Sequence, residues 1–335
     1  MNISPPHKAF TSSRDVKGIL ETARGRTVVV LGDLMLDEWI IGTASRISPE
    51  APVPVVRLVQ RKTAPGGAAN VAMNLLSLGA RVAVCGVVGD DEAGADLARE
   101  LKEAGADIGG LVRDATRPTT LKTRVVAQGQ QMVRVDRESD EVLNGVVLER
   151  LCAVLPPLCE GAAVLCISDY DKGLAMCGVV TTALAGARAT GLRITGGPKP
   201  CNLECFKGTD LLSLNQKEAS EAAGMKLESE SAIERAGAML RAQTEAAALV
   251  ITRGVRGVTL FQEDAPPCHI AGHEVEVFDV AGAGDTFLAA ASVALAGGAD
   301  FEAAAYLGNL AGAASVRHHG VVAITPDEVR RIAAE

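Results

Sequence analysis

The sequence predicts an α/β fold built on one central, mainly parallel sheet with helices on both faces. Short runs of apolar, β-branched residues alternate with longer segments of helical periodicity, which is the rhythm of βαβ units. The predicted strands are apolar throughout, as in sheets buried between two layers of helices. A chain of 335 residues with 48% hydrophobic residues can also bury a full core.

The elements follow one another in a regular order. The run TVVVLGD at 27–33 is the first buried strand, and the segment 66–80 places apolar residues at helical spacing. A second strand at 81–91 and a helix at 92–107 continue the pattern. The remaining predictions are strands at 162–173, 192–200, 210–218, 247–254 and 257–262, and helices at 174–191, 284–298, 302–316 and 325–335.

Two segments interrupt this rhythm. Residues 39–62 hold four prolines or glycines and a partly alternating strand, and residues 119–138 alternate apolar with polar side chains. Alternation indicates strands with one face in water. We expect a small β lid formed by about 39–62 and 113–138, which covers a cleft or pairs with a second subunit. Residues 1–24 are expected to be a tail and first helix, and 25–335 one domain.

Charge and composition exclude several classes of protein. A net charge of −8 without a basic run excludes a general nucleic-acid binder. The N-terminal residues lack the apolar core of a secretory signal, and no run approaches about 18 apolar residues, so we expect a cytoplasmic chain without a membrane span. The cysteines fall mostly in apolar segments without a C-x-x-C, which indicates reduced thiols. Cys201 and Cys205 could join His269 in a metal site, although their spacing lacks a second pair.

The stretch DVAGAGDTF places an acid directly behind glycines at a helix start. Gly282 and Gly284 let the backbone turn without a Cβ penalty. The amides of Ala283, Gly284 and Asp285 then lack intrahelical partners, and together with the helix dipole they would bind an anion. An acid fits there if it accepts a proton from a hydroxyl during phosphoryl transfer. Taken alone, a helix cap is the simpler interpretation of Asp285.

The same stretch resembles the C-terminal signature of the ribokinase-like, phosphofructokinase-B type carbohydrate kinases. PGGAANVAMNLLSLGA resembles their N-terminal signature, about 215 residues earlier. The segments GDLMLDEWIIGTASRISPEAPVPVV, RVVAQGQQMVRVD and ISDYDKG further resemble the heptose 7-phosphate kinases of lipopolysaccharide core synthesis. The resemblance covers nearly the whole chain after about residue 25. It implies a ribokinase-like fold and favours a general base over a cap at Asp285.

The resemblance also implies an activity. It is the ATP-dependent phosphorylation of D-glycero-D-manno-heptose 7-phosphate at O1, giving the 1,7-bisphosphate of ADP-heptose synthesis, with Mg²⁺ as cofactor. Relatives often bind K⁺ near the positions of Asp279 and Gly320. The motif H-x-G-H of a fused nucleotidyltransferase is absent from RHHGV near the end, so a stand-alone kinase is expected. Its expected partners are ATP and a sugar phosphate, without nucleic acid or membrane, in a homodimer through the β lid.

Individual roles follow by matching motifs. Asp285 would be the base, and Gly282, Ala283 and Gly284 would supply amides to the transferring phosphate. The sugar side would comprise Asp37, the weaker candidate Asp33, Gly66, Gly67, Asn70 and Asp169. The 7-phosphate candidates are Arg124, Arg134, Lys172 and Lys199, each with a solvated surface position as its alternative. The nucleotide side would comprise Asn215, Glu218, Thr252, Gly257 and Asn309, with Glu218 reaching Mg²⁺ through water.

Two positions depart from the family pattern, and other functions compete. Ala281 replaces the usual Thr, and Gly197 replaces the usual Asp before Pro-Lys, which weakens the metal and phosphate assignments, including that of Lys199. A fructokinase or ribokinase type of sugar kinase is the nearest alternative. A nicotinamide-dependent oxidoreductase is disfavoured because no G-x-G-x-x-G follows the first strand. A non-catalytic sugar-binding regulator is the third alternative.

Overall fold

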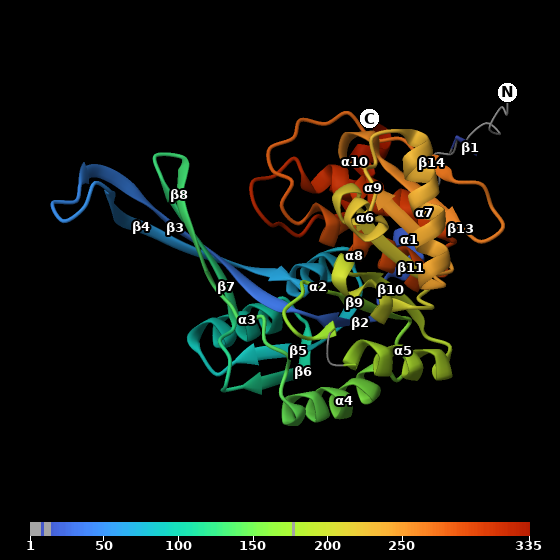
Figure 1. The fold of residues 1–335 in the computed structure, drawn as a ribbon, viewed down its shortest axis with the longest axis horizontal. Coiled ribbons are helices and arrows are strands. Elements are labelled where there is room, and N and C mark those ends of the chain that lie inside the picture. The colour runs from blue at the N-terminus through green and yellow to red at the C-terminus, as the bar shows by residue number, and fades with distance from the viewer. Residues whose placement is uncertain (1–7, 10–14, 176–177) are drawn as a thin grey trace.

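The computed structural model describes residues 8–9, 15–175 and 178–335, and its centre is one ten-stranded sheet (Figure 1). The strand order is β1-β14-β13-β12-β11-β10-β9-β2-β5-β6. Neighbouring strands are parallel except where β13 pairs with β12 and β14. The strands are β1 (Lys8–Ala9), β2 (Thr27–Gly32), β5 (Arg81–Gly89), β6 (Asp107–Asp114), β9 (Val164–Ser168), β10 (Arg193–Gly197), β11 (Leu211–Asn215), β12 (Ala248–Thr252), β13 (Val258–Gln262) and β14 (Cys268–Ile270).

Helices cover both faces of this sheet, which confirms the predicted fold class. Alternate residues of β2 show why the strand is apolar throughout: Val28 and Val30 belong to one core, whereas Val29 and Leu31 belong to the other. The first core contains residues of α1 (Val16–Ala23), α2 (Ala68–Ser77), α3 (Glu92–Glu103), α8 (Ala283–Ala296), α9 (Phe301–Ser315) and α10 (Pro326–Ala334). The second contains residues of α4 (Gly145–Cys159), α5 (Val179–Thr190), α6 (Gln216–Ala223), α7 (Glu230–Thr244) and the 3₁₀ helix η2 (Pro200–Phe206).

A second sheet of four strands projects from this body, in the order β4-β3-β7-β8 (Figure 1). It consists of β3 (Leu34–Ile47), β4 (Pro54–Gly67), β7 (Thr120–Ala127) and β8 (Gln130–Arg137), and we call it the lid. Its bounds differ from the expected ones. The first two strands extend inward to Leu34 and Gly67, and the sequence did not predict these inner ends because their buried residues do not alternate with exposed ones. Residues 113–114 belong to β6 of the central sheet.

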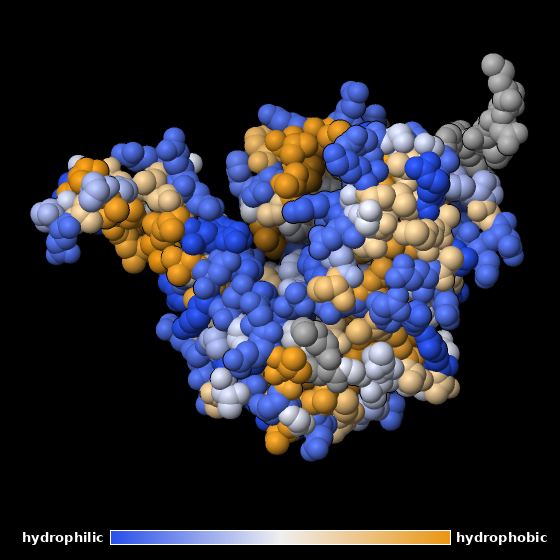
Figure 2. All heavy atoms as spheres, viewed as in Figure 1, coloured by the Kyte–Doolittle hydropathy of each residue, from blue (hydrophilic) through white to orange (hydrophobic). Residues whose placement is uncertain are grey.

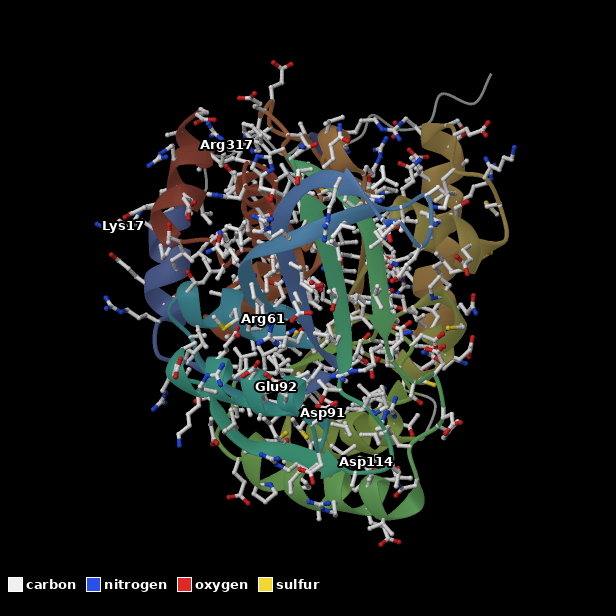
Figure 3. The ribbon with its side chains drawn as sticks, turned by 90° about the vertical axis from the view of Figure 1, so that its left-hand side faces the viewer. Lys17, Arg61, Asp91, Glu92, Asp114 and Arg317 are labelled. Atoms are coloured by element: carbon white, nitrogen blue, oxygen red, sulfur yellow. The ribbon has the colours of Figure 1, made fainter. Side chains whose placement is uncertain are left out.

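Polar contacts join the base of the lid to the body. Arg61 of β4 bonds Glu38 at 2.6 Å and reaches Asp96 of α3 at 3.5 Å and Glu92 at 3.7 Å (Figure 3). Farther out, the lid exposes large apolar side chains (Figure 2), which we call the lid patch: Ile47, Val53, Leu58, Val59, Met132, Val133 and Val135. Among the helices of the described ranges, none is long and apolar enough to cross a membrane.

Candidate active site

The candidate site lies at the carboxyl ends of the central strands, where ligands of doubly wound sheets bind. A cavity of about 180 Å³ opens there, bounded on one side by the start of α8. Its lining includes residues that follow or end four neighbouring strands, namely Asp169, Tyr170, Lys199, Asn215, Glu218 and Thr252, together with Gly282, Gly284 and Asp285. The topology therefore gathers residues that are far apart in the sequence into one cavity.

The glycine loop before α8 adopts the conformation expected of an anion site. Gly282 is the N-cap with φ 77°, in the left-handed region that favours glycine, and it makes no side-chain cap. A Cβ at this position would lie 2.8 Å from Nδ2 of Asn70. Asp285 is the third residue of the helix, and its carboxylate bonds to other elements. The cap interpretation of Asp285 is therefore wrong.

Asp285 is buried, with 8% of its surface exposed, and both of its carboxylate oxygens are bonded. The hydroxyl of Tyr170 donates to Oδ1 at 2.6 Å, and Nδ2 of Asn70 donates to Oδ2 at 2.9 Å. Burial raises the pKa of Asp285 to about 6, while these two hydrogen bonds and the charge of Lys199 act in the opposite direction. The group is thus mostly ionised at pH 7 and close to the pKa that suits a general base.

The predicted sugar residues of the lid surround Asp37. The Asp37 carboxylate is buried, and Arg124 of β7 donates to its Oδ1 at 2.6 Å. Arg124 also lies 5.2 Å from the centre of the Trp39 ring. A Cβ on Gly66 would lie 2.3 Å from Oδ2 of Asp37, so only glycine permits this approach. Gly67 turns the chain into α2 with φ 56°, and α2 then carries Asn70 to Asp285.

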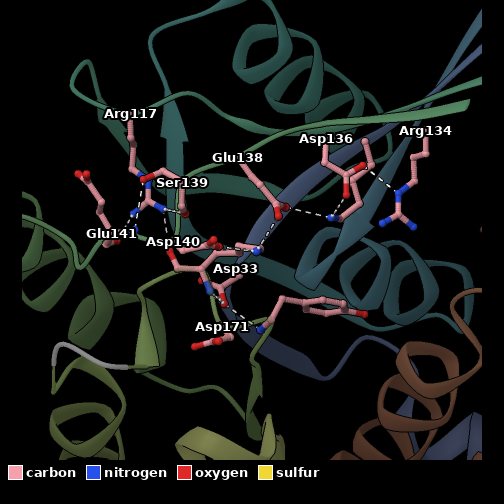
Figure 4. A network of polar contacts seen from close by, with 12 residues as sticks. Asp33, Arg117, Arg134, Asp136, Glu138, Ser139, Asp140, Glu141 and Asp171 are labelled. Atoms are coloured by element: carbon pink, nitrogen blue, oxygen red, sulfur yellow. Dashed lines mark hydrogen bonds and ion pairs between the residues drawn. The ribbon is translucent and has the colours of Figure 1, made fainter.

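Asp33 and Asp169 lie in the same region, but main-chain donors occupy their carboxylates. Oδ2 of Asp33 accepts from the amides of Tyr170 at 2.8 Å and Lys172 at 3.1 Å (Figure 4). Asp169 accepts from the amide of Lys199 at 2.8 Å and from Asn202. Burial raises the pKa of Asp33 to about 6 and also raises that of Asp169. Both residues shape the loop after β9, and their contacts with a sugar stay a prediction.

The four residues predicted to bind the 7-phosphate lie in different parts of the structure. Lys199 pairs with Glu218 at 2.7 Å, and both residues line the first cavity together with Asp285. Arg124 and Arg134 are cross-strand neighbours in the lid, where Arg134 is half exposed and bonds Asp136 at 2.9 Å (Figure 4).

The carboxylates of Asp136 and Glu138 in this polar network (Figure 4) also pair with two lysines, Lys172 and one that the sequence did not single out. The Lys172 ammonium pairs with Glu138 at 3.0 Å and Asp140 at 2.6 Å. Lys122 of β7 contacts Glu138 at 3.0 Å and Asp136 at 3.3 Å. These carboxylates hold the cations in place beside the lid face that carries Asp37.

A second cavity of about 200 Å³, which contains the predicted nucleotide residues Thr252, Gly257 and Asn309, is lined mainly by glycines and apolar residues of the segments 252–258, 272–287 and 308–316. Thr252 and Gly284 line both cavities, so the two cavities are adjacent. Asn309 borders the second cavity and donates to the carbonyl of Ala271 at 2.8 Å. Gly257 has φ 81° and packs so tightly that a Cβ would lie 2.1 Å from the carbonyl oxygen of Ile270.

Two further pairs of predicted residues make defined contacts within the chain. Asn215 and Glu218 form a reciprocal capping box at the start of α6, which fixes the Glu218 carboxylate at the cavity. Asp279 accepts from the amides of Ala281 and Gly320, each at 3.0 Å, so the two segments expected to hold a monovalent cation are adjacent. In the described part of the chain, no cluster of His, Cys, Asp or Glu could hold a metal, which leaves the cysteine alternative unsupported.

Sequence reasoning missed Tyr170. The residue lies in the quoted segment ISDYDKG, and the chain has only two tyrosines. A phenol directly after a buried strand, at the ligand-binding edge of the sheet, was the available signal. Its contact with Asp285 joins residues 115 positions apart, and no local pattern contains that information.

Comparison with known families identifies the chain. The profile described as pfkB family carbohydrate kinase matches residues 26–328. The chain belongs to the pfkB family. This pfkB protein is therefore an ATP-dependent sugar kinase, as the two signatures predicted.

Relatives and solved structures agree with this assignment. Bifunctional protein HldE of Geobacter metallireducens is 41% identical over 316 residues, which cover 94% of the pfkB chain and 64% of the relative. Bifunctional protein HldE of Caulobacter vibrioides is 42% identical over 312 residues, covering 92% and 64%. The pfkB chain thus spans less than two thirds of these relatives.

Among solved structures, two illustrate the shared fold. Phosphofructokinase-2 from Escherichia coli in complex with substrates and products has a TM-score of 0.75 at 21% identity, covering 92% of the pfkB chain and 98% of that structure. Arabidopsis thaliana ribokinase complexed with ribose and ATP has a TM-score of 0.71 at 19% identity, covering 93% and 99%. These likenesses show the ribokinase-like fold.

Proposed function

We propose that this kinase phosphorylates D-glycero-D-manno-heptose 7-phosphate at O1 to give the 1,7-bisphosphate, in ADP-heptose and lipopolysaccharide inner-core synthesis. One observation carries the proposal: the buried carboxylate of Asp285 lies between the glycine loop before α8 (residues 282–284), which we also call the anion loop, and the lid residues around Asp37. The heptose kinase motifs GDLMLD and ISDYDKG supply the acceptor side of this arrangement. The HldE relatives match 94% and 92% of the chain, which supports a substrate of this class.

The geometry supports in-line transfer of a phosphoryl group. Asp285 accepts the proton of the O1 hydroxyl, O1 forms a bond to the γ-phosphorus of ATP, and the bond from that phosphorus to the bridging oxygen breaks to release ADP. The amides of Gly282 and Gly284 would donate to the oxygens of the group in transfer, whereas the amide of Ala283 donates to the carbonyl of Val280 at 3.3 Å. Lys199 at the cavity adds positive charge to the phosphates.

Residues at the cavity also fit the nucleotide and Mg²⁺. The apolar second cavity suits the adenine ring, and it meets the first cavity at Thr252 and Gly284, where the phosphates would lie. Glu218 and Asn215 offer oxygen ligands of the kind that hold Mg²⁺ directly or through water. The ion would supply neutralising charge to the β- and γ-phosphates. Asp279 and the Gly320 loop are the proposed K⁺ site, and one solved structure is Escherichia coli phosphofructokinase-2 in complex with potassium.

The 7-phosphate would bind to one face of the lid. Alternate residues of a strand share a face, which places Lys122 and Arg124 of β7 together with Arg134 of β8 beside Asp37. A phosphate dianion would replace part of the present carboxylate pairing of these cations. The same lid would form the homodimer interface, since the lid patch exposes apolar side chains that are costly to leave in water.

Steady-state assays with the heptose 7-phosphate, the unphosphorylated heptose, ribose and fructose test the proposal. The heptose 7-phosphate should give the highest kcat/KM. Arg134→Gln should raise KM for the phosphorylated sugar and leave KM for the unphosphorylated heptose unchanged. Arg137→Gln is the matched control, because Arg137 is also half exposed on β8 but pairs with Asp91. A preference for ribose or fructose would instead identify another sugar kinase of the family.

Sedimentation velocity tests the dimer separately. The chain should sediment as a dimer, and the double variant Val59→Glu, Val135→Glu should sediment as a monomer because it places charge in the lid patch. Lys17→Glu, at an exposed position of α1, is the control for a change in net charge alone. A monomeric parent protein would contradict the proposed interface.

A further inference from the structure

We propose that Tyr170 is a positioning residue for phosphoryl transfer, whose hydroxyl holds the Asp285 carboxylate ionised and correctly oriented for the acceptor. This inference rests on the proposed function of Asp285 as the base. It goes beyond the family motif, because no matched signature assigns a role to the phenol. Three features of the structure carry it: the phenol's contact, its protonation state and the independent anchoring of the residue.

The contact leaves Asp285 with a defined accepting capacity. A carboxylate offers about four lone-pair sites on two oxygens. Tyr170 occupies one site on Oδ1 and Asn70 occupies one on Oδ2, at 2.6 and 2.9 Å. Two different elements, the loop after β9 and helix α2, thus fix the carboxylate plane. A remaining lone pair can accept the acceptor hydroxyl without rotation of the side chain.

The phenol can act only as a donor in this contact. Burial, together with the adjacent charge of Asp285, raises the pKa of Tyr170 well above its usual value of 10. The hydroxyl therefore keeps its proton at every pH at which the enzyme works, and Tyr170 cannot replace Asp285 as the base. Its donated hydrogen bond favours the ionised carboxylate and partly offsets the effect of burial.

Other contacts already hold the body of Tyr170 in place. Its amide donates to Asp33 at 2.8 Å, and the Lys199 ammonium lies 4.9 Å from the ring centre. Removing the hydroxyl alone keeps both contacts, so Tyr170→Phe isolates the donated hydrogen bond. The charged or titratable groups that act on Asp285 and on its hydrogen-bond partner Tyr170 are Lys199, Asp37, Glu218 and the buried thiol of Cys166.

The first test is the pH dependence of kcat/KM for the sugar. Tyr170→Phe should move the acidic limb upward by about one pH unit, because a hydrogen bond to a charged group is worth about that much. Activity should then be about fivefold below the parent at pH 6 and within about twofold at pH 8.5. Tyr306→Phe is the matched control, since it removes the only other phenol of the chain.

A spectroscopic titration keeps this test independent of the substrate. ¹³C-carboxyl labelling of aspartate, with Asp285→Asn to assign the signal, gives the Asp285 midpoint in the absence of any sugar. Tyr170→Phe should raise that midpoint by about one unit, and Tyr306→Phe should not change it. If no sugar is phosphorylated but the midpoint moves, the proposed function fails while the contact of Tyr170 stands.

Fluorotyrosine provides a second variant, which should shift the titration midpoint of Asp285 in the opposite direction. In a Tyr306→Phe background, biosynthetic 3-fluorotyrosine enters only position 170. The more acidic phenol is a stronger donor and should lower the Asp285 midpoint, and its ¹⁹F signal should titrate with Asp285. An unchanged Asp285 midpoint in both variants would overturn the proposal. A Tyr170→Phe enzyme with a lower KM for the sugar and an unchanged pH profile would also overturn the proposal, because the phenol would then only fill the position that the sugar hydroxyl takes.

Discussion

The acceptor half and the nucleotide half of this site are built in different ways. Around Asp285, polar side chains from β3, β7, α2 and the loop after β9 are joined by hydrogen bonds of 2.6–2.9 Å. The second cavity is lined largely by glycines and apolar side chains. The acceptor half therefore depends on individual polar side chains, whereas the nucleotide half depends on the shape of its backbone. Substitutions next to Asp285 should lower kcat, and those at the second cavity should raise KM for ATP.

Asp285→Asn should have the largest effect. The variant keeps the volume and loses the proton acceptor, so kcat should fall by about 10³-fold while sugar and ATP binding persist. Rapid-quench turnover and calorimetric titration of both ligands measure the two quantities. A variant that retains a tenth of the parent's kcat would show that another group accepts the proton.

Gly282→Ala sharpens the comparison within the anion loop. The new Cβ would require a strained left-handed φ and would lie 2.8 Å from Nδ2 of Asn70, so it should displace a partner of the base and lower kcat about a hundredfold. Gly284→Ala meets nothing within 4 Å and should chiefly raise KM for ATP, because it borders the nucleotide cavity. Equal losses of kcat in both variants would contradict the proposed difference between the acceptor half and the nucleotide half of the site.

Lys199→Met should affect the nucleotide side more than the chemistry. Its ammonium pairs with Glu218 at 2.7 Å and is a third exposed, so KM for ATP should rise about tenfold with a smaller change in kcat. Isothermal titration with a non-hydrolysable ATP analogue checks the binding loss. A change confined to the KM of the sugar would place Lys199 on the 7-phosphate instead, as the sequence first suggested.

The last prediction concerns the stability of the folded state and not turnover. Burial raises the pKa of Asp285 from 3.8 to about 6, so the ionised group destabilises the folded state above about pH 6 and costs nothing below about pH 4. Asp285→Asn should therefore raise the free energy of unfolding by about 3 kcal/mol at pH 8, with the gain vanishing as the pH falls towards 4. Denaturant titrations at pH 4 and pH 8 measure this, and a gain that grows at low pH would contradict it.

The central sheet was predictable from sequence because burial on both faces leaves a continuous apolar run. The side chains of Val28 to Leu31 pack alternately into the two cores, so every residue of this run is apolar in the sequence. The inner ends of β3 and β4 gave no such signal, since their buried residues do not alternate. Helix α4, which contains Pro156 and Pro157, was not predicted, because its tertiary packing overrides the proline signal.

The site was predictable where residues lie in one motif and not where they meet across the fold. The glycine loop and Asp285 belong to a single helix start. In contrast, the engagement of Asp33 with loop amides, the ion pairs of Lys172 and the contact of Tyr170 with Asp285 join distant segments. Side-chain pairing of this kind depends on the packed structure, and composition or spacing does not encode it.

The most direct test of the central claim is a crystal structure of Asp285→Asn with the heptose 7-phosphate and a non-hydrolysable ATP analogue. We predict that the sugar O1 lies about 3 Å from the side chain at position 285, in line with the γ-phosphorus and beside the amides of the glycine loop. An O1 atom placed instead against Asp37, out of reach of position 285, would contradict the account.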